Sequence, residues 1–278
     1  MIKLFATKID YKIPQELKQY VIAIIQGESE ATIDVIYPVF PTGFPLVINI
    51  YNDIPTLHIN NQIIYPKSRL QIAGQIYNAD VNIEVKGIFG QIGLVLYPSA
   101  PYYLFHKMGD SFLNRWCNLE NCSPLSLKNI HNDLSDCQTP LDRVSILLEF
   151  VKLLHSNRLP EIEWLDKTLH KVYSLGGKIS QENLAEKAEI SLRHFRRKFK
   201  EIIGVSPKYF CKVIQLNTVF EMLSANDTEK LHHLALDCGY YDQAHFINDF
   251  KKLIGNSPVN FLNGEHSYVK TYLGRSGV

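Results

Sequence analysis

The sequence predicts an α+β protein in which a β-rich N-terminal part precedes a helical C-terminal part. Three observations lead to this fold class. Short segments of β-branched and aromatic residues recur about every 10 to 12 residues through the first hundred positions, which is typical of small antiparallel barrels and sandwiches. After residue 139 the apolar residues recur with helical spacing instead. In the C-terminal third, one helical motif occurs twice.

Turn-forming residues separate the predicted strands of the N-terminal part. Asn60-Asn61 is typical of a hairpin turn. The glycines at residues 87–93 also fit a hairpin turn better than a phosphate-binding loop, because no lysine and no helix follow them. Together the segments predict a mainly antiparallel, cupin-like β domain over residues 1–138. The predicted strands are residues 46–52, 56–60, 70–77, 82–87 and 92–98.

Two amphipathic helices are predicted next, at residues 141–156 and 161–175, each with apolar residues along one face. We expect them to pack within the chain against the β domain; the alternatives are a helical bridge and a dimer seam. Residues 174–178 follow as a linker, because Gly176 and Gly177 end the helix and permit the next domain to reorient. The helical bridge and the linker together are placed at residues 139–177.

The repeated motif occupies residues 191–207 and 242–258, and both copies contain F-x-x-x-F-K-x-x-I-G-x-S-P. Phe195 and Phe199 lie four residues apart, so they share one helical face and predict a buried stripe. The glycine predicts a helix end, and Ser-Pro predicts the start of the next helix. A shorter apolar helix precedes each copy. Its inward-facing residues are predicted to be Leu184, Ala185 and Ala188 in the first copy, and Leu231, Leu234, Ala235 and Cys238 in the second. The sequence therefore predicts two helix-turn-helix units.

The polar face of the first copy is basic, and two such copies favour DNA binding over a helical array that contacts another protein. The predicted connecting helix, residues 206–223, is about 27 Å long. The major groove of a duplex returns about every 34 Å, so the second helix of each unit can enter a successive groove segment. Arginine and lysine suit guanine and phosphates, whereas glutamine and asparagine suit adenine. The candidate DNA-contacting residues are Arg193, His194, Arg196, Arg197, Lys200, Gln243, His245, Asn248 and Lys251.

The pattern over residues 179–261 resembles the AraC/XylS family of bacterial transcription regulators. The resemblance rests on both Phe-x-x-x-Phe-Lys stretches, both Gly-x-Ser-Pro endings, and Ala235-x-x-Cys238-Gly239-Tyr240. It implies a seven-helix domain at residues 178–265, in which a long helix joins two helix-turn-helix motifs. It also implies sequence-specific binding to double-stranded promoter or operator DNA and control of transcription. RNA polymerase, a small-molecule effector and a homodimer partner are the further partners to consider.

The β-rich part resembles the cupin-like half-barrel that precedes this unit in many members of the family, so we expect it to sense a signal or to dimerise. Three residues depart from the family pattern. Gln215 and Asn248 stand where the family usually has arginine, and Asp249 follows Asn248. We therefore expect the first copy to supply most of the affinity and of the base recognition.

Composition narrows the function classes. Net charge is +1, with the part before residue 173 slightly acidic and the rest slightly basic. Five cysteines, an odd number, indicate a reducing compartment, and Cys211 and Cys238 fall within helical patterns as core thiols. Cys117 and Cys122 do not fit a zinc site, because no histidine is near them; redox sensing by this pair stays open. The N-terminus lacks a signal peptide and no apolar run approaches a membrane span, so we expect a cytoplasmic protein without a membrane partner.

Catalysis and cofactors are not expected. His58 and His106 are too far apart for the histidine cluster of a metal-binding cupin, and the motifs of hydrolases and nucleotide-binding enzymes are missing from the sequence. The sequence thus predicts a non-enzymatic DNA-binding regulator with no metal and no cofactor. The alternative is a small-molecule-binding or enzymatic β-barrel whose helical tail makes protein contacts. Salt-dependent affinity for DNA separates the two hypotheses.

Overall fold

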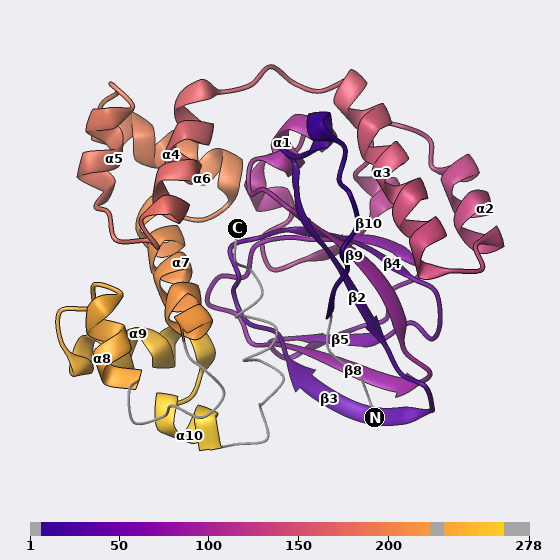
Figure 1. The fold of residues 1–278 in the computed structure, drawn as a ribbon, viewed down its shortest axis with the longest axis horizontal. Coiled ribbons are helices and arrows are strands. Elements are labelled where there is room, and N and C mark those ends of the chain that lie inside the picture. The colour runs from indigo at the N-terminus through magenta and orange to yellow at the C-terminus, as the bar shows by residue number, and fades with distance from the viewer. Residues whose placement is uncertain (1–6, 223–230, 264–278) are drawn as a thin grey trace.

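An antiparallel β domain and a helical domain lie side by side in the computed structural model, which describes residues 7–222 and 231–263 (Figure 1). This arrangement confirms the predicted α+β class. The strands are β1 (Thr7–Lys8), β2 (Val21–Glu28), β3 (Ile33–Pro38), β4 (Leu46–Ile50), β5 (Thr56–Ile59), β6 (Gln62–Ile64), β7 (Leu70–Ala73), β8 (Val81–Gly87), β9 (Gly90–Leu96) and β10 (Trp116–Asn118).

Most helices follow the strands in the chain. One short α-helix and two 3-10 helices lie between strands. The α-helices are α1 (Ala100–Phe105), α2 (Lys128–Asp136), α3 (Pro140–Ser156), α4 (Glu163–Ser174), α5 (Gln181–Lys187), α6 (Leu192–Ile203), α7 (Pro207–Met222), α8 (Leu231–Asp237), α9 (Gln243–Ile254) and α10 (Pro258–Asn263). The 3-10 helices are η1 (Gln15–Leu17), η2 (Gly109–Ser111) and η3 (Leu119–Asn121).

The strands form two sheets in which neighbouring strands are antiparallel. The larger sheet has the order β1-β2-β9-β4-β7-β10, and the smaller has the order β3-β8-β5-β6. All five predicted segments contain strand, and the predicted turns at Asn60 and after Gly87 connect β5 to β6 and β8 to β9. The strands that the sequence pattern did not predict are β1, β2, β3, β6 and β10. In β2 the apolar run lacks the alternation that distinguishes a strand from a buried helix.

The largest difference between a predicted and an observed strand end is in β7. β7 stops at Ala73, not at residue 77, because the backbone of Phe112 approaches Gly74 so closely that a Cβ there would overlap it. From that point the chain leaves the sheet, and residues 74–79 form a loop on the side of the β domain that faces the helices. This loop is one of the places where the two domains touch.

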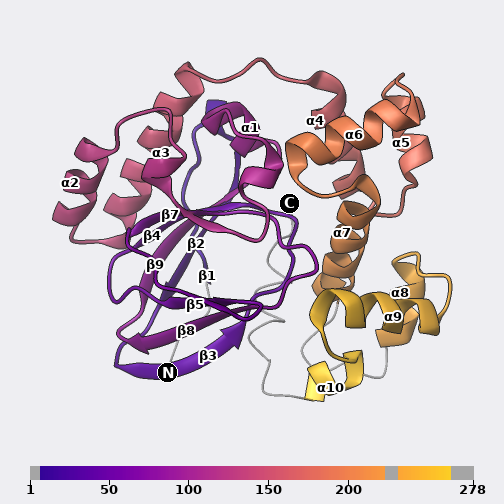
Figure 2. The ribbon, with the colours of Figure 1, turned by 180° about the vertical axis from the view of Figure 1, so that it is seen from behind.

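Helix α3 packs on the β domain, as predicted. Pro140 occupies its first turn, and Thr139 and Asp142 form a reciprocal capping box. Val144, Leu148 and further buried residues of α3 share one core with strand β9 and helix α1 (Figure 2). The expectation that both bridge helices pack this way is confirmed for α3.

Helix α4 lies between the two domains, so the same expectation is confirmed only in part for the second helix. Asp166 of α4 accepts hydrogen bonds from Ser99 and Tyr103, which precede residue 138, but the apolar stripe of α4 packs on α6. Leu165, Leu169 and Val172 belong to a core that also contains Phe195 and Phe199 of α6. Residues 157–162 between α3 and α4 let the chain cross from one domain to the other, and α4 then covers the apolar stripe of α6. A sequence pattern shows that a helix has an apolar face but does not identify the surface that covers it.

The predicted linker lies against α7. Gly176 and Gly177 both have positive φ, at 54° and 76°, so they end α4 as expected. Gly177, however, lies directly against α7, where a Cβ would overlap the carbonyl oxygen of Cys211. The segment therefore packs against α7 in this arrangement, and its freedom to reorient stays a prediction.

The turn between α5 and α6 contains Glu189 with a φ of +56°, where the second unit has Gly239 with a φ of +86°. A side chain in this left-handed region costs roughly 1 kcal/mol relative to glycine. Glu189→Gly is therefore expected to raise the free energy of unfolding by about 1 kcal/mol in urea titrations. Glu186→Gly, on the exposed face of α5, is the control and should lower it by about 1 kcal/mol. A loss of stability in the first variant would contradict the strain.

Candidate nucleic-acid interface

The first helix-turn-helix unit consists of α5, the turn at Glu189, and α6. Ser191 is the N-cap of α6, and its Oγ accepts a hydrogen bond from the backbone N–H of His194. Gly204 ends the helix with a φ of +92°, as the sequence predicts. Phe195 and Phe199 are fully buried with their ring centroids 5.8 Å apart, which confirms the predicted stripe.

The second unit repeats this construction with α8 and α9. Asp242 is the N-cap of α9 and accepts from the backbone N–H of His245 at 2.7 Å. Gly255 ends the helix with a φ of +81°, and Phe246 and Phe250 are buried. Among the predicted inward-facing residues of α8, Ala235 and Cys238 are buried, whereas the side chains of Leu231 and Leu234 lie outside the described residues.

Helix α7 joins the two units and contributes to the core of each. Phe210 and Ile214 pack with the first unit, and Leu216 and Phe220 pack with the second. At 16 residues the helix is about 24 Å long, and Figure 2 shows α6 at one of its ends and α9 at the other. The predicted helix end at residue 223 and the predicted domain end at residue 265 lie outside the described residues.

All nine candidate residues are exposed on α6 and α9. The candidate side chains differ in whether they also contact other side chains of the protein. Arg196 donates to Gln181 Oε1 at 2.9 Å and Glu182 Oε1 at 3.1 Å on α5, and Arg197 pairs with Glu201 at 3.2 Å. Exposed pairs of this kind are worth little and leave the guanidinium groups accessible. The remaining first-unit candidates, Arg193, His194 and Lys200, have no side-chain partner in the part of the chain that the structure describes.

The structure changes the interpretation of Asp249. The sequence suggests an acidic group beside the DNA, but the carboxylate is only 4% exposed and both of its oxygens lie 2.6 Å from Lys212 Nζ on α7. Asp249 therefore belongs to the buried side of α9. The sequence contained a sign that residue 249 is buried. It lies three residues after Phe246 and four before Leu253, and both of these residues are on the buried stripe.

Gln215, the second departure from the family pattern, is also a structural residue. Its side chain is 9% exposed, and Nε2 donates to the carbonyl oxygen of Cys238 at 2.9 Å. This bond ties α7 to the turn between α8 and α9, where Gly239 has positive φ. Asn248, by contrast, is exposed on α9, as are the other candidate residues of this helix.

The β domain contacts the C-terminal ends of α6 and α9, the second helices of the two units. Gly109 in η2 lies against the end of α6 so closely that a Cβ would overlap the backbone of Gly204. The end of α9 faces a cavity of about 520 Å³, whose other walls include residues 38–41 and 78–81 of the β domain. The N-terminal ends of α6 and α9 therefore point away from the β domain (Figure 2). Arg193 and Gln243 belong to the first turns of these two helices. The sequence did not predict these contacts with the β domain, because a glycine that fits a turn does not show which distant segment of the chain packs against it.

A loop of the β domain also packs along α7. Phe40 lies in the core of the second unit, with its ring 5.7 Å from that of Phe261. Phe44 stacks on Tyr173 of α4 at 5.2 Å, and Asn217 of α7 donates to the carbonyl oxygen of Thr42 at 2.7 Å. One loop between β3 and β4 therefore contacts the second unit, the connecting helix α7 and the bridge helix α4.

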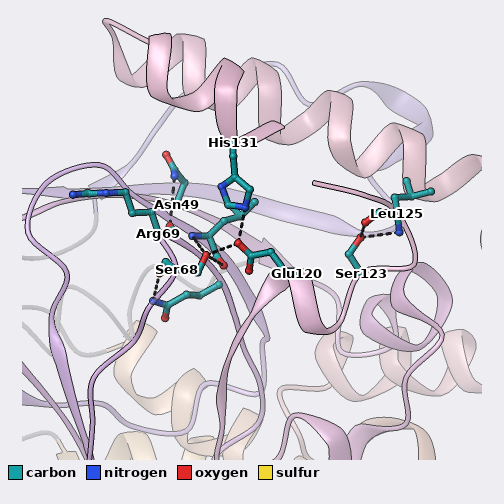
Figure 3. Close-up of polar contacts among 9 residues, drawn as sticks. Asn49, Ser68, Arg69, Glu120, Ser123, Leu125 and His131 are labelled. Carbon is teal, nitrogen blue, oxygen red and sulfur yellow. Dashed lines mark hydrogen bonds and ion pairs between the residues drawn. The ribbon is translucent and has the colours of Figure 1, made fainter. Parts of the chain in front are cut away.

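Two groups of polar side chains lie within the β domain, away from α6 and α9. Glu120 accepts from Ser68 Oγ at 2.8 Å and pairs with His131 at 2.5 Å, which attaches α2 to the sheet (Figure 3). The neighbouring thiol of Cys122 lowers the pKa of Cys117 to about 7. Within residues 7–222 and 231–263, no cluster of three or more histidine, cysteine and acidic side chains could hold a metal ion.

Comparisons with known proteins identify the C-terminal part. Residues 184–264 match a family model described as a helix-turn-helix domain. The HTH-type transcriptional activator RhaS of Escherichia fergusonii is 25% identical over 141 residues, which are 46% of this chain and 48% of that protein. An uncharacterized HTH-type transcriptional regulator of Haemophilus influenzae is 35% identical over 80 residues, 29% of this chain and 26% of that protein. The chain thus spans about half the length of the first relative and about a quarter of the second.

A solved structure of ToxT from Vibrio cholerae is similar to 84% of this chain and 98% of its own, with 9% identity and a TM-score of 0.44. In the described residues of this chain, no helix is long and apolar enough to cross a membrane. The repeated units, the long helix between them and the match over residues 184–264 lead to one conclusion: the chain has a helix-turn-helix domain of the AraC/XylS type, which follows an N-terminal β domain.

Proposed function

We propose that this protein is a sequence-specific DNA-binding transcription regulator that contacts two adjacent major-groove segments. The observation that carries the proposal is the placement of exposed basic and amide side chains on α6 and α9, at the two ends of one continuous helix. The names of the two curated relatives, a transcriptional activator and a transcriptional regulator, support the same function.

The two units are expected to contribute unequally. Five candidate residues lie on α6, three of them arginines, whereas α9 offers Gln243, His245, Asn248 and Lys251. Arginine forms bidentate contacts with guanine and binds phosphates, so α6 supplies most of the affinity. Amide side chains suit adenine edges, and α9 accordingly adds sequence discrimination.

The β domain regulates the DNA-binding unit in this proposal. We divide the chain into a sensing or dimerising domain at residues 1–138, a bridge at residues 139–177 and a DNA-binding domain at residues 178–265. The loop that includes Phe40 and Phe44 provides the physical connection, because a shift of this loop alters the packing of α7 and α4. A signal that changes the population of two such arrangements changes DNA affinity. The role is regulatory and not enzymatic, and its further partners are an effector, RNA polymerase and a second copy of the chain.

The test is selection of bound sequences from a random pool of duplex DNA with the purified full-length chain, at two salt concentrations. Enrichment of two short elements about one helical turn apart supports the proposal. An affinity that falls steeply with salt indicates several phosphate contacts. No enrichment and no salt-dependent binding would favour the alternative, a small-molecule-binding β domain whose helical tail contacts other proteins.

Arg193→Ala is expected to lower affinity for the selected site about tenfold, because a lost arginine contact costs about 1–3 kcal/mol of binding. Its exposed side chain has no partner among the described residues, so the melting temperature should stay unchanged. Both quantities are measured on the same preparation, by fluorescence anisotropy and thermal denaturation. Lys152→Ala, an exposed cation on α3, is the control for general loss of positive charge. An equal loss of affinity in both variants would contradict a specific role for Arg193.

A further inference from the structure

Asp249 is a buried acidic group in the middle of a helix that is proposed to contact DNA. Its side chain is 4% exposed, and its two oxygens each accept a hydrogen bond of 2.6 Å from Lys212 Nζ. Lys212 belongs to α7 and is 29% exposed. The pair therefore joins the second recognition helix, α9, to the helix that connects the two units.

Asp249 also fixes the ring of His245, which lies one helical turn earlier. His245 Nε2 is 3.2 Å from Asp249 Oδ2, and Nδ1 accepts from the backbone N–H of Tyr241 at 3.4 Å. The ring of Tyr240 contacts the histidine ring edge to face, with centroids 5.4 Å apart. Both ring nitrogens thus have partners when the proton is on Nε2, and the ring has one defined position at the exposed surface of α9.

The first unit is built differently at the corresponding position. The residue that matches Asp249 in the repeat is Lys198, whose Nζ pairs with Glu201 at 2.9 Å on the same helix. Helix α6 meets α7 through apolar contacts such as Phe199 against Phe210, with ring centroids 5.7 Å apart. Apolar contacts tolerate small rotations, whereas a short, two-oxygen ion pair is directional.

We propose that Asp249 and Lys212 are positioning residues that set the orientation of α9 on α7. Through its contact with His245, Asp249 also sets the orientation of the side chains that contact the second DNA element. This inference rests on the proposed DNA-binding function. Removal of Lys212 would leave His245 as the one described side-chain partner of the buried carboxylate. A buried charge that loses its lysine partner is strongly unfavourable, so the helix would move to expose the carboxylate. The movement would alter recognition at the second element while leaving the first unit intact.

The experiment uses the full chain and three duplexes: the selected two-element site, the same site with its second element scrambled, and the same site with its first element scrambled. The variants are Lys212→Met, Asp249→Asn, the two combined, and the conservative Lys212→Arg. Glu163→Gln removes an exposed ion pair with Lys167 on α4 and serves as the matched control. Affinities and melting temperatures are measured on the same preparations.

Lys212→Met and Asp249→Asn are each expected to lower affinity for the intact site about tenfold, to the level of the site with a scrambled second element. Affinity for that scrambled site should not change. The combined variant should show the same loss as either single variant, yet melt above Lys212→Met, because it contains no unpaired buried carboxylate. Lys212→Arg should keep most of the discrimination, and Glu163→Gln all of it.

Four outcomes would overturn the inference or its basis. An equal loss on the intact site and on the site with a scrambled second element would mean a general structural role. Unchanged affinity in both single variants would mean that the pair does not position α9. If the unaltered protein bound the intact site and the second-scrambled site equally, the inference would fail while the proposed function survived. Failure of the unaltered protein to bind any DNA would overturn the proposed function itself.

Discussion

Phe199→Ala is expected to lower the free energy of unfolding by about 3–5 kcal/mol, the usual cost of truncating a buried phenylalanine. Phe199 is fully buried, and its ring lies 5.8 Å from Phe195 and 5.7 Å from Phe210. It therefore links α6 to α7 at the centre of the first unit. Loss of that much stability is comparable to the total stability of a small domain, so the first unit is expected to unfold at physiological temperature.

The measurement is urea unfolding followed by far-UV circular dichroism, with DNA affinity on the same preparation. Phe250→Ala, the equivalent change in the second unit, should give a loss of the same size, since that ring is also buried. Leu236→Ala is the control, because its side chain on α8 is 46% exposed. A stability loss below about 1 kcal/mol for Phe199→Ala would mean that the aromatic cluster of the first unit can collapse around the cavity.

Phe40→Ala is expected to lower stability by about 3 kcal/mol and also to weaken DNA binding, although residue 40 belongs to the β domain. Its side chain is 7% exposed and packs in the core of the second unit against Phe261. The substitution opens a cavity at the contact between the domains, next to the loop position where Thr42 accepts from Asn217. We expect the β domain and the helical domain to separate and then to unfold in two transitions.

Differential scanning calorimetry distinguishes one cooperative transition from two. Ile36→Ala is a suitable control, because the side chain is 60% exposed on β3, shortly before the loop, and should change stability by less than about 0.5 kcal/mol. A single, unshifted transition for Phe40→Ala would show that the second unit does not depend on the β domain. An unchanged DNA affinity despite two transitions would show that the domain contact does not influence DNA binding.

The candidate interface was predictable because its information is local. Caps, helix ends and the buried stripe of each unit follow from residues within about twenty positions of one another, as the agreement at Ser191, Gly204, Phe195 and Phe199 shows. The repeat strengthened the prediction, since two copies in register exclude coincidence. Eight of the nine exposed candidates lie where helical periodicity places them, away from the two phenylalanine stripes. Gln243 lies three residues before Phe246 and is exposed in the first turn of α9.

Other features depended on partners that are distant in the sequence. The helix at residues 163–174 has an apolar face, but its neighbours in α6 are more than twenty residues away, so the sequence did not distinguish them from the β sheet. Asp249 was misinterpreted for the same reason, because the lysine that neutralises it lies on α7, 37 residues earlier. The contact between Gly109 and Gly204 joins two glycines that each look like an ordinary turn residue.

The sequence by itself thus determined the fold class, the double helix-turn-helix domain and the set of side chains available to DNA, because periodicity and capping act over a few residues. Only the tertiary structure decided which surface covers each apolar face, how the β domain contacts both DNA-binding units, and that Asp249 is a buried partner of Lys212. These features depend on long-range packing, in which the identity of the neighbour and not the pattern of the segment determines the energy of a buried group.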